Sequence, residues 1–265
     1  MGNMKITAVL IQSLVFSAAL ALTGCGGGGG DTSAPGAVAQ LPPTPVAITA
    51  EGLYLGTTST GRTVTGIILD NGTYWVIYSV ANNSAVIAGA VQGTGTSLNG
   101  NFTSSNAKDF NVEGQRIDDA TVSASYVAKQ SLNGLVTYPA TSLNVTFVST
   151  YSAAYDQAPS LVTIAGTYTG TAAVVGGTEP ASLVISASGG LTGVGASGCQ
   201  FSGTVSLHPK GNVYDVAVTF AGGVCSNGTS TVTGIGYFDS ATKRLYSTAL
   251  NSSRTNGFIF VGTKP

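Results

Sequence analysis

Short strand-forming runs that alternate with tight turns constrain this chain more than any other feature of its sequence. The tripeptide Asp70-Asn71-Gly72, for example, separates residues 63–69 (TVTGIIL) from residues 73–78 (TYWVIY). Asn-Gly between two β-prone runs is the strongest short-range indication of a hairpin. Similar runs and turns continue from about residue 50 to the end of the chain, which predicts an all-β fold.

Some runs show the two-residue period of a strand that buries one face. From Tyr214 to Phe220 every second side chain is large and apolar, and the three between them (Asp215, Ala217 and Thr219) are charged or small. The chain also has 37 glycines and only 8% charged residues, so the long charged helix formers are scarce. This composition is typical of strands and turns.

We expect the strands to pair with their neighbours in an antiparallel meander. Closing such a meander removes its exposed edges, so we predict two small up-and-down β-barrels of about eight strands each, similar in size to lipocalin barrels. A β-sandwich is the alternative fold. A membrane-spanning barrel is disfavoured because many alternating positions are Thr, Ser or Asn, whereas its outward face would be apolar.

Two short stretches share one pattern and predict an internal duplication. They are Gly52-Leu53-Tyr54-Leu55-Gly56-Thr57 and Gly166-Thr167-Tyr168-Thr169-Gly170-Thr171, and each opens a block of about a hundred residues. The blocks match poorly beyond these openings. We place the domain boundary near residues 156–160, which gives one barrel at residues 50–156 and a second at residues 157–265.

The amino-terminal residues carry a different pattern. An apolar stretch at residues 6–22 follows Lys5 and ends in Leu22-Thr23-Gly24-Cys25. This order resembles the lipobox of bacterial lipoproteins, which implies a signal peptide at residues 1–24 and a lipid (palmitate) anchor on Cys25. Gly26 stands where an aspartate would favour the inner membrane, so the resemblance favours the outer membrane and leaves its face open. An uncleaved transmembrane helix is the alternative, but the stretch is short for a span and glycines follow it.

A linker is expected between this anchor and the barrels. Residues 25–49 contain five consecutive glycines and the cluster Pro42-Pro43-Thr44-Pro45. Neither composition supplies the apolar side chains that offset the entropy of ordering. We therefore expect a flexible segment that separates the folded part from the membrane.

Two cysteines remain once Cys25 is assigned to lipid. Cys199 and Cys225 form an even pair in a chain expected to be exported, which predicts a disulfide bond. A metal pair is the alternative. It lacks ligands, because His208 is the single histidine of the chain.

The lipobox, the glycine-rich linker and the strand motifs Gly52–Gly56 and Gly166–Gly170 together resemble surface lipoproteins of the transferrin-binding protein B and factor H-binding protein type. The resemblance implies small eight-stranded barrels that bind host proteins. None of that family's partner-binding residues can be matched here, so none is carried over.

Motifs for catalysis are weak. Gly193-Val194-Gly195-Ala196-Ser197-Gly198 matches a dinucleotide-binding fingerprint by letter, but a strand-like run follows it where a helix is required. His208 precedes Pro209 in a turn, without a neighbouring nucleophile, and is expected to be a solvated loop residue. No catalytic residues and no cofactor are predicted.

One acidic group could bind calcium. Asp109, Glu113, Asp118 and Asp119 lie close together in the sequence, with residues 106–109 expected in a loop. Their spacing matches no known calcium loop, and Lys108 and Arg116 offset the charge. A salt-bridged, solvated loop is therefore expected, and no metal site is predicted.

Aromatic residues of the first block could line a pocket for an apolar ligand, although core packing is favoured because eight strands enclose little space. These residues are Tyr74, Trp75, Tyr78, Phe102, Phe110, Tyr126 and Tyr138.

The sequence therefore predicts an outer-membrane lipoprotein that is not an enzyme and that binds a protein partner. A carrier of a small apolar ligand and a purely structural envelope protein are the alternatives. A net charge of −1 and the lack of a basic patch argue against nucleic acid as a partner.

Overall fold

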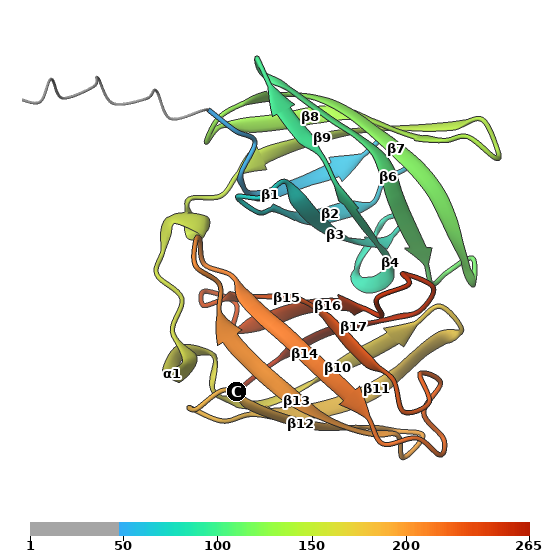
Figure 1. Cartoon of the computed structure of the whole chain (residues 1–265), viewed down its shortest axis with the longest axis vertical. Helices are drawn as coiled ribbons and strands as arrows, with labels where there is room; N and C mark the ends of the chain where they lie inside the picture. Colours follow the sequence, from blue (N-terminus) through green and yellow to red (C-terminus); the bar gives the residue numbers. More distant parts are fainter. Residues whose placement is uncertain (1–47) are drawn as a thin grey trace, which may run out of the picture. The chain divides into compact units, whose positions relative to one another are not determined.

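The computed structural model describes residues 48–265, and most of them lie in β-strands (Figure 1). The predicted signal peptide, Cys25 and nearly all of the predicted linker lie outside the described residues. Two short helical turns interrupt the strands: η1 (Ala153–Asp156) and α1 (Leu161–Ile164). No helix within residues 48–265 is long and apolar enough to span a bilayer.

The first barrel is built from the blue to green strands of Figure 1. Its strands are β1 (Gly52–Thr58), β2 (Thr63–Ile68), β3 (Thr73–Val80), β4 (Asn83–Thr94), β5 (Thr96–Leu98), β6 (Asn101–Asn111), β7 (Arg116–Val127), β8 (Ser131–Tyr138) and β9 (Leu143–Tyr151). All pairings are antiparallel, and β4 pairs with β6 so that eight strands close into a ring. The short β5 extends the edge beside β6.

The predicted hairpin at Asn71-Gly72 joins β2 to β3. Gly72 has a φ of +80°, a left-handed conformation that glycine adopts at little cost, and its amide donates to the carbonyl of Leu69 at 3.0 Å. The local turn residues therefore set this register, as expected from sequence.

The second barrel is closed by eight strands in chain order, drawn in yellow to red in Figure 1. They are β10 (Gly166–Val174), β11 (Gly177–Ile185), β12 (Gly190–Gly195), β13 (Gln200–Leu207), β14 (Tyr214–Phe220), β15 (Thr231–Asp239), β16 (Arg244–Leu250) and β17 (Gly257–Thr263). The predicted pair of antiparallel barrels is confirmed.

The two opening motifs occupy equivalent places. Each forms the first strand of its barrel, which pairs with the second and the last strand. The hydroxyl of Tyr54 donates to the carbonyl of Ala50, and that of Tyr168 donates to the carbonyl of Ile164, in both cases four residues earlier. A Cβ atom on Gly56 or Gly170 would collide with a backbone carbonyl of the last strand, so glycine is required at both positions.

A helical turn comes directly before the second opening motif. α1 ends at Ile164, and β10 begins at Gly166. The Ser160 side chain accepts a hydrogen bond from the amide of Thr163 and caps this helical turn. A capping serine therefore outweighs the local strand preference of the residues that follow.

The interior of the second barrel is packed with large side chains. Tyr214, Val216, Val218 and Phe220 of β14 are buried in its core, which confirms their predicted inward orientation. The rings of Phe201 and Phe258 lie 5.1 Å apart between their centroids.

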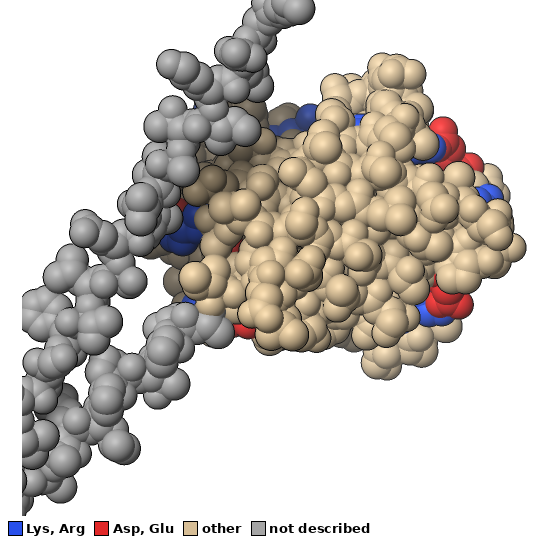
Figure 2. Space-filling model, turned by 90° about the horizontal axis from the view of Figure 1, so that it is seen from above, with Lys and Arg blue, Asp and Glu red and all other residues tan. Residues whose placement is uncertain are grey.

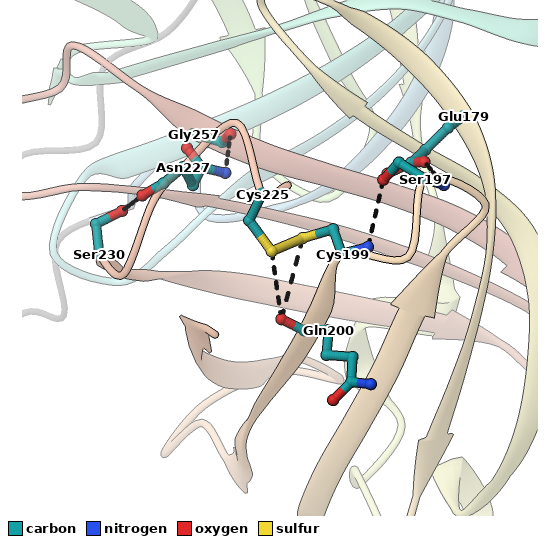
Figure 3. Close-up of a disulfide and its surroundings, with 8 residues drawn as sticks. All are labelled: Glu179, Ser197, Cys199, Gln200, Cys225, Asn227, Ser230 and Gly257. Carbon is teal, nitrogen blue, oxygen red and sulfur yellow. Dashed lines mark hydrogen bonds between the residues drawn. A yellow bond between two sulfur atoms is a disulfide. The ribbon is translucent and has the colours of Figure 1, made fainter. Parts of the chain in front are cut away.

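Cys199 and Cys225 form a disulfide bond at one end of the second barrel, with their Cα atoms 4.7 Å apart (Figure 3). It joins the β12–β13 turn to the β14–β15 loop. Asn227 in the same loop donates from Nδ2 to the carbonyl of Gly257 at 3.2 Å, and Ser197 in the facing turn donates from its amide to Glu179 at 2.7 Å. The disulfide therefore lies within hydrogen-bonded loops.

Charge contributes little to the visible surface. Figure 2 shows the blue and red side chains in small separate groups on a face that is otherwise uncharged.

Candidate functional site

A cavity of about 220 Å³ lies inside the first barrel. Its wall is largely apolar and comes from strands all around the ring; six of these residues are Val64, Val76, Val91, Val122, Val136 and Phe147. The corresponding space among the core side chains of the second barrel, near Ile164 and Phe258, is only about 10 Å³. The first barrel therefore holds an apolar cavity between its strands, whereas the second is packed around Ile164 and Phe258.

A second hollow of about 230 Å³ lies beside the disulfide, where turn residues such as Gly176, Ser197 and Ser226 form much of its rim. Because this rim is polar and made of turns, it resembles an open end of a barrel more than an enclosed ligand site. The cavity of the first barrel is the stronger candidate.

The floor of this cavity is closed by aromatic side chains. Tyr74 and Phe102 pack edge to face with their ring centroids 5.6 Å apart, and the Tyr74 hydroxyl donates to Ser104 at 3.0 Å. The fully buried Ala50 packs in the same core cluster, and Tyr126 donates to the carbonyl of Ile48 at 2.8 Å. The residues just before β1 therefore help to seal this end.

Ion pairs lie at the opposite, open end. The Arg62 guanidinium lies 2.6 Å from Glu113, and its Cζ lies 5.5 Å from the centroid of the Tyr78 ring. Arg116 lies 2.8 Å from Asp118. The lining of the cavity includes Arg62, Arg116 and Asp118. A ligand that enters at this end would therefore pass these ion-paired side chains before it reaches the apolar part of the wall.

Asp109 is the charged group deepest in the wall. It belongs to β6, lines the cavity and is only 3% exposed. The Tyr78 hydroxyl donates to its Oδ1 at 2.7 Å, and the Tyr138 hydroxyl donates to its Oδ2 at 2.8 Å. Burial raises the pKa of the Asp109 carboxyl, and the hydrogen bonds from both tyrosines oppose this rise.

Both tyrosines are held as donors. Burial, with the nearby Asp109 carboxylate, raises the pKa of Tyr78 and of Tyr138 far above the ordinary value of 10.0. Their hydroxyls therefore keep their protons at any physiological pH. Each carboxylate oxygen of Asp109 therefore accepts one hydrogen bond from a tyrosine hydroxyl. The rings of the same two tyrosines form part of the cavity wall.

Glycines opposite two of the wall tyrosines make room for the rings. Gly89 pairs with Tyr78 and Gly93 pairs with Tyr74 across β3 and β4, and a Cβ at either glycine would collide with the facing tyrosine. This pairing lets large rings lie flat against the barrel wall. It leaves the middle of the barrel open.

The structure divides the aromatic residues that were expected near a pocket. Tyr74, Tyr78, Phe102 and Tyr138 line the cavity, whereas Tyr126 packs in its floor. Trp75 and Phe110 were included wrongly. They lie on the outward face of their strands, in an apolar cluster that includes residues of both barrels, because side chains alternate along a strand.

The expected acidic loop was wrong in its secondary structure, because residues 106–109 lie in β6 and Asp118 and Asp119 lie in β7. The expected salt bridges are present: Glu113, Asp118 and Asp119 pair with Arg62, Arg116 and Lys108. Asp109 faces the interior instead. Within residues 48–265 no group of three or more His, Cys, Asp or Glu side chains is arranged to hold a metal ion.

His208 lies in a turn, as expected, but it is not solvated. Its side chain is 12% exposed, with Nδ1 2.8 Å from Oδ1 of Asp215 and Nε2 3.8 Å from Asp70. Sequence distance concealed Asp70, which approaches only in the folded chain. The stretch at residues 193–198 forms the end of β12 and a turn, and β13 follows in place of the helix that a dinucleotide site needs.

Comparisons with known proteins add little to this geometry. No protein-family model matches the sequence, and no curated protein matches it significantly. A solved structure from Bacteroides fragilis, provisionally described as an outer membrane protein, is 16% identical over 82% of this chain and 98% of its own, with a TM-score of 0.26. Similarity at this level supports no inference about function. The resemblance to transferrin-binding protein B remains a prediction.

Proposed function

We propose that this chain is a binding protein whose first barrel holds a small, largely apolar molecule. The observation that carries this proposal is the contrast between the two interiors. The first barrel holds a largely apolar cavity of about 220 Å³ lined by strands all around the ring. In the second barrel the space of similar volume lies beside the disulfide under a rim of turns, and only about 10 Å³ remains near Ile164 and Phe258. A cavity that served only stability would cost free energy, because each unfilled space forfeits packing contacts.

The form of the cavity also supports this role. Its apolar wall, its aromatic floor and its few convergent polar groups are the features by which proteins bind small organic molecules. A cavity of about 150 Å³ holds benzene, so about 220 Å³ suits a body of roughly nine or ten non-hydrogen atoms.

Two further parts of the proposal rest on the sequence. The resemblance of residues 22–25 to a lipobox supports a lipid anchor on Cys25, and Gly26 favours the outer membrane. In labelling with radioactive palmitate, we expect the unaltered chain to take up label and Cys25→Ala to take up none. Label that persists in Cys25→Ala would contradict the anchor.

We also propose that the protein is not an enzyme, because the candidate residues within residues 48–265 are not arranged to activate a nucleophile. Asp109 is held between two protonated tyrosines, and His208 faces carboxylates without a nucleophile beside them. A protein partner remains a separate proposal, supported by the sequence resemblance alone. Capture of a specific protein by the purified chain would test it.

Ligand binding is tested by calorimetry with 2-phenylethanol, a neutral probe of suitable size. The chain from residue 26 onward contains the whole compact unit Val46–Pro265 and avoids the predicted lipid. We expect saturable binding of one probe per chain. Val122→Trp should abolish it, because Val122 lines the cavity and the larger ring would fill it.

Val127→Trp is the matched control. Val127 lies on the same strand, β7, but is 52% exposed, so the added ring points into solvent and binding should persist. No saturable binding to the unaltered chain, or equal loss in both variants, would contradict a ligand site in the first barrel.

A further inference from the structure

We propose that the molecule held in the first barrel carries a basic amine, and that Asp109 is the residue that recognises it. This inference rests on the proposed function, since it assigns a chemical class to the same cavity. It follows from an uncompensated carboxylate in an apolar wall.

Asp109 lacks a cationic partner. None of the ion pairs formed within residues 48–265 includes it, although it is only 3% exposed. A buried carboxylate is costly unless it is paired with a cation or fully hydrogen-bonded. Two tyrosine hydroxyls are its side-chain donors, one for each oxygen.

The neighbouring cations are already occupied. Arg62 pairs with Glu113, Arg116 with Asp118, and Lys108 with Asp119. Each of these three basic residues therefore has its own carboxylate. Arg62 lowers the pKa of the Asp109 carboxyl through its charge, but it forms its ion pair with Glu113. Asp109 thus presents to the cavity a carboxylate without a direct cationic partner, which would attract a cation and repel an anion.

The arrangement leaves capacity for an ammonium group. A carboxylate oxygen has two lone pairs, and each Asp109 oxygen uses one of them for a tyrosine. One lone pair on each oxygen remains for an N–H donor. The rings of Tyr78 and Tyr138 flank the same carboxylate and line the cavity, so their faces could add cation–π attraction.

The rest of the wall fixes the other half of the ligand. Val76, Val91 and Val122 surround the same space without polar atoms in their side chains. The ligand class is therefore a small aromatic or aliphatic body with one amine, rather than a sugar, a nucleotide or a fatty acid.

The test compares three probes that share one apolar body: 2-phenylethylamine, 2-phenylethanol and phenylacetic acid. We expect calorimetry at neutral pH to give the tightest binding for the amine, by about tenfold over the alcohol, because hydrogen bonds to charged groups are the stronger ones. The acid should bind most weakly. This ranking uses the unaltered chain, so it does not depend on any variant folding.

A variant then assigns the preference to one residue. Asp109→Asn keeps the size of the side chain and removes its charge, so we expect the amine to bind no better than the alcohol. Asp119→Asn is the matched control. Asp119 lies on the neighbouring strand β7, but its side chain is 74% exposed, pairs with Lys108 and does not line the cavity, so the preference for the amine should remain.

The outcomes separate the two proposals. If none of the probes binds, the ligand site itself fails. If the alcohol binds but the amine binds no more tightly, or if Asp109→Asn leaves the preference intact, the cavity stands as a ligand site and the amine inference is overturned.

Discussion

Gly89 lies directly across from Tyr78, and the tyrosine ring occupies the space where a Cβ atom of residue 89 would stand. The same ring holds Asp109 through its hydroxyl. Because Gly89 has no side chain, the Tyr78 ring can lie where its hydroxyl reaches the buried carboxylate of Asp109.

Replacing this glycine should disturb both the wall and the carboxylate. In Gly89→Ala the new methyl group would meet the Tyr78 ring and the backbone carbonyl of Phe110. We expect a loss of about 2 kcal/mol in the free energy of unfolding, as is usual for overpacking a buried site. Urea denaturation of the purified chain measures it.

Gly176→Ala is the matched control for that substitution. A Cβ on Gly176 meets nothing within 4 Å, so the change should stay within about 0.5 kcal/mol of the unaltered chain. Equal effects of the two substitutions would contradict the close approach of Tyr78 to Gly89.

The stability of the chain should depend on pH through Asp109. Burial raises the pKa of its carboxyl in the folded chain above 3.8, so the folded state holds this proton more tightly than the unfolded state does. Between those two pKa values the folded chain binds more protons, and this group's contribution to the free energy of unfolding falls as the pH rises. Above the folded pKa its contribution stays at the lower value.

Asp109→Asn removes this dependence, so the variant should gain stability relative to the unaltered chain as the pH rises from about 3 to about 8. Urea denaturation at several pH values measures the difference. Asp119→Asn, on the exposed face of β7, shows how much of any slope comes from loss of a surface carboxylate. Parallel curves for the unaltered chain and Asp109→Asn would be inconsistent with the raised pKa.

The two opening motifs should contribute similar stability. Tyr54→Phe and Tyr168→Phe each remove a buried hydroxyl that donates to the carbonyl four residues earlier. Each variant should therefore lose about 1 kcal/mol. Because the two tyrosines lie in different barrels, the double variant should lose the sum. A loss in only one of the two would argue against equivalent roles.

The disulfide should stabilise the second barrel chiefly by restricting its unfolded state. Cys199 and Cys225 are separated by 26 residues, and closing a loop of that size is worth about 3 kcal/mol in the chain-entropy treatment. Denaturation of a variant with Cys199→Ala and Cys225→Ala should show that loss, and the unaltered chain under a reducing agent should behave alike. A difference below about 1 kcal/mol would mean that strain or residual structure offsets the entropy.

Much of the fold could be predicted from local patterns. The hairpin at Asn71-Gly72 and the inward set from Tyr214 to Phe220 follow from turn chemistry and the two-residue period, which depend only on neighbouring residues. The prediction of a loop at residues 106–109 was wrong. These residues belong to β6, which pairs with both β4 and β7, and their polar side chains gave no sign of that tertiary pairing.

The candidate site was only partly visible in the sequence. Tyr78 and Tyr138 were among the aromatic residues considered for a pocket, whereas Asp109 was assigned to a charged loop. An isolated aspartate in a polar segment gives no indication that it will face inward. The two hydroxyls that hold it lie 31 and 29 residues away.

By itself, then, the sequence determined that this chain forms strands joined by tight turns, and that two similar motifs each open a barrel. Only the tertiary structure decided which barrel holds an apolar cavity between its strands. Apolar residues face inward in both. In the second barrel Phe201, Phe220 and Phe258 pack together near the disulfide, whereas in the first the valines surround a space beside Asp109. Whether inward side chains from different strands meet depends on the stagger of the eight strands around the barrel. This stagger is set by the whole barrel and cannot be deduced from the sequence of one strand.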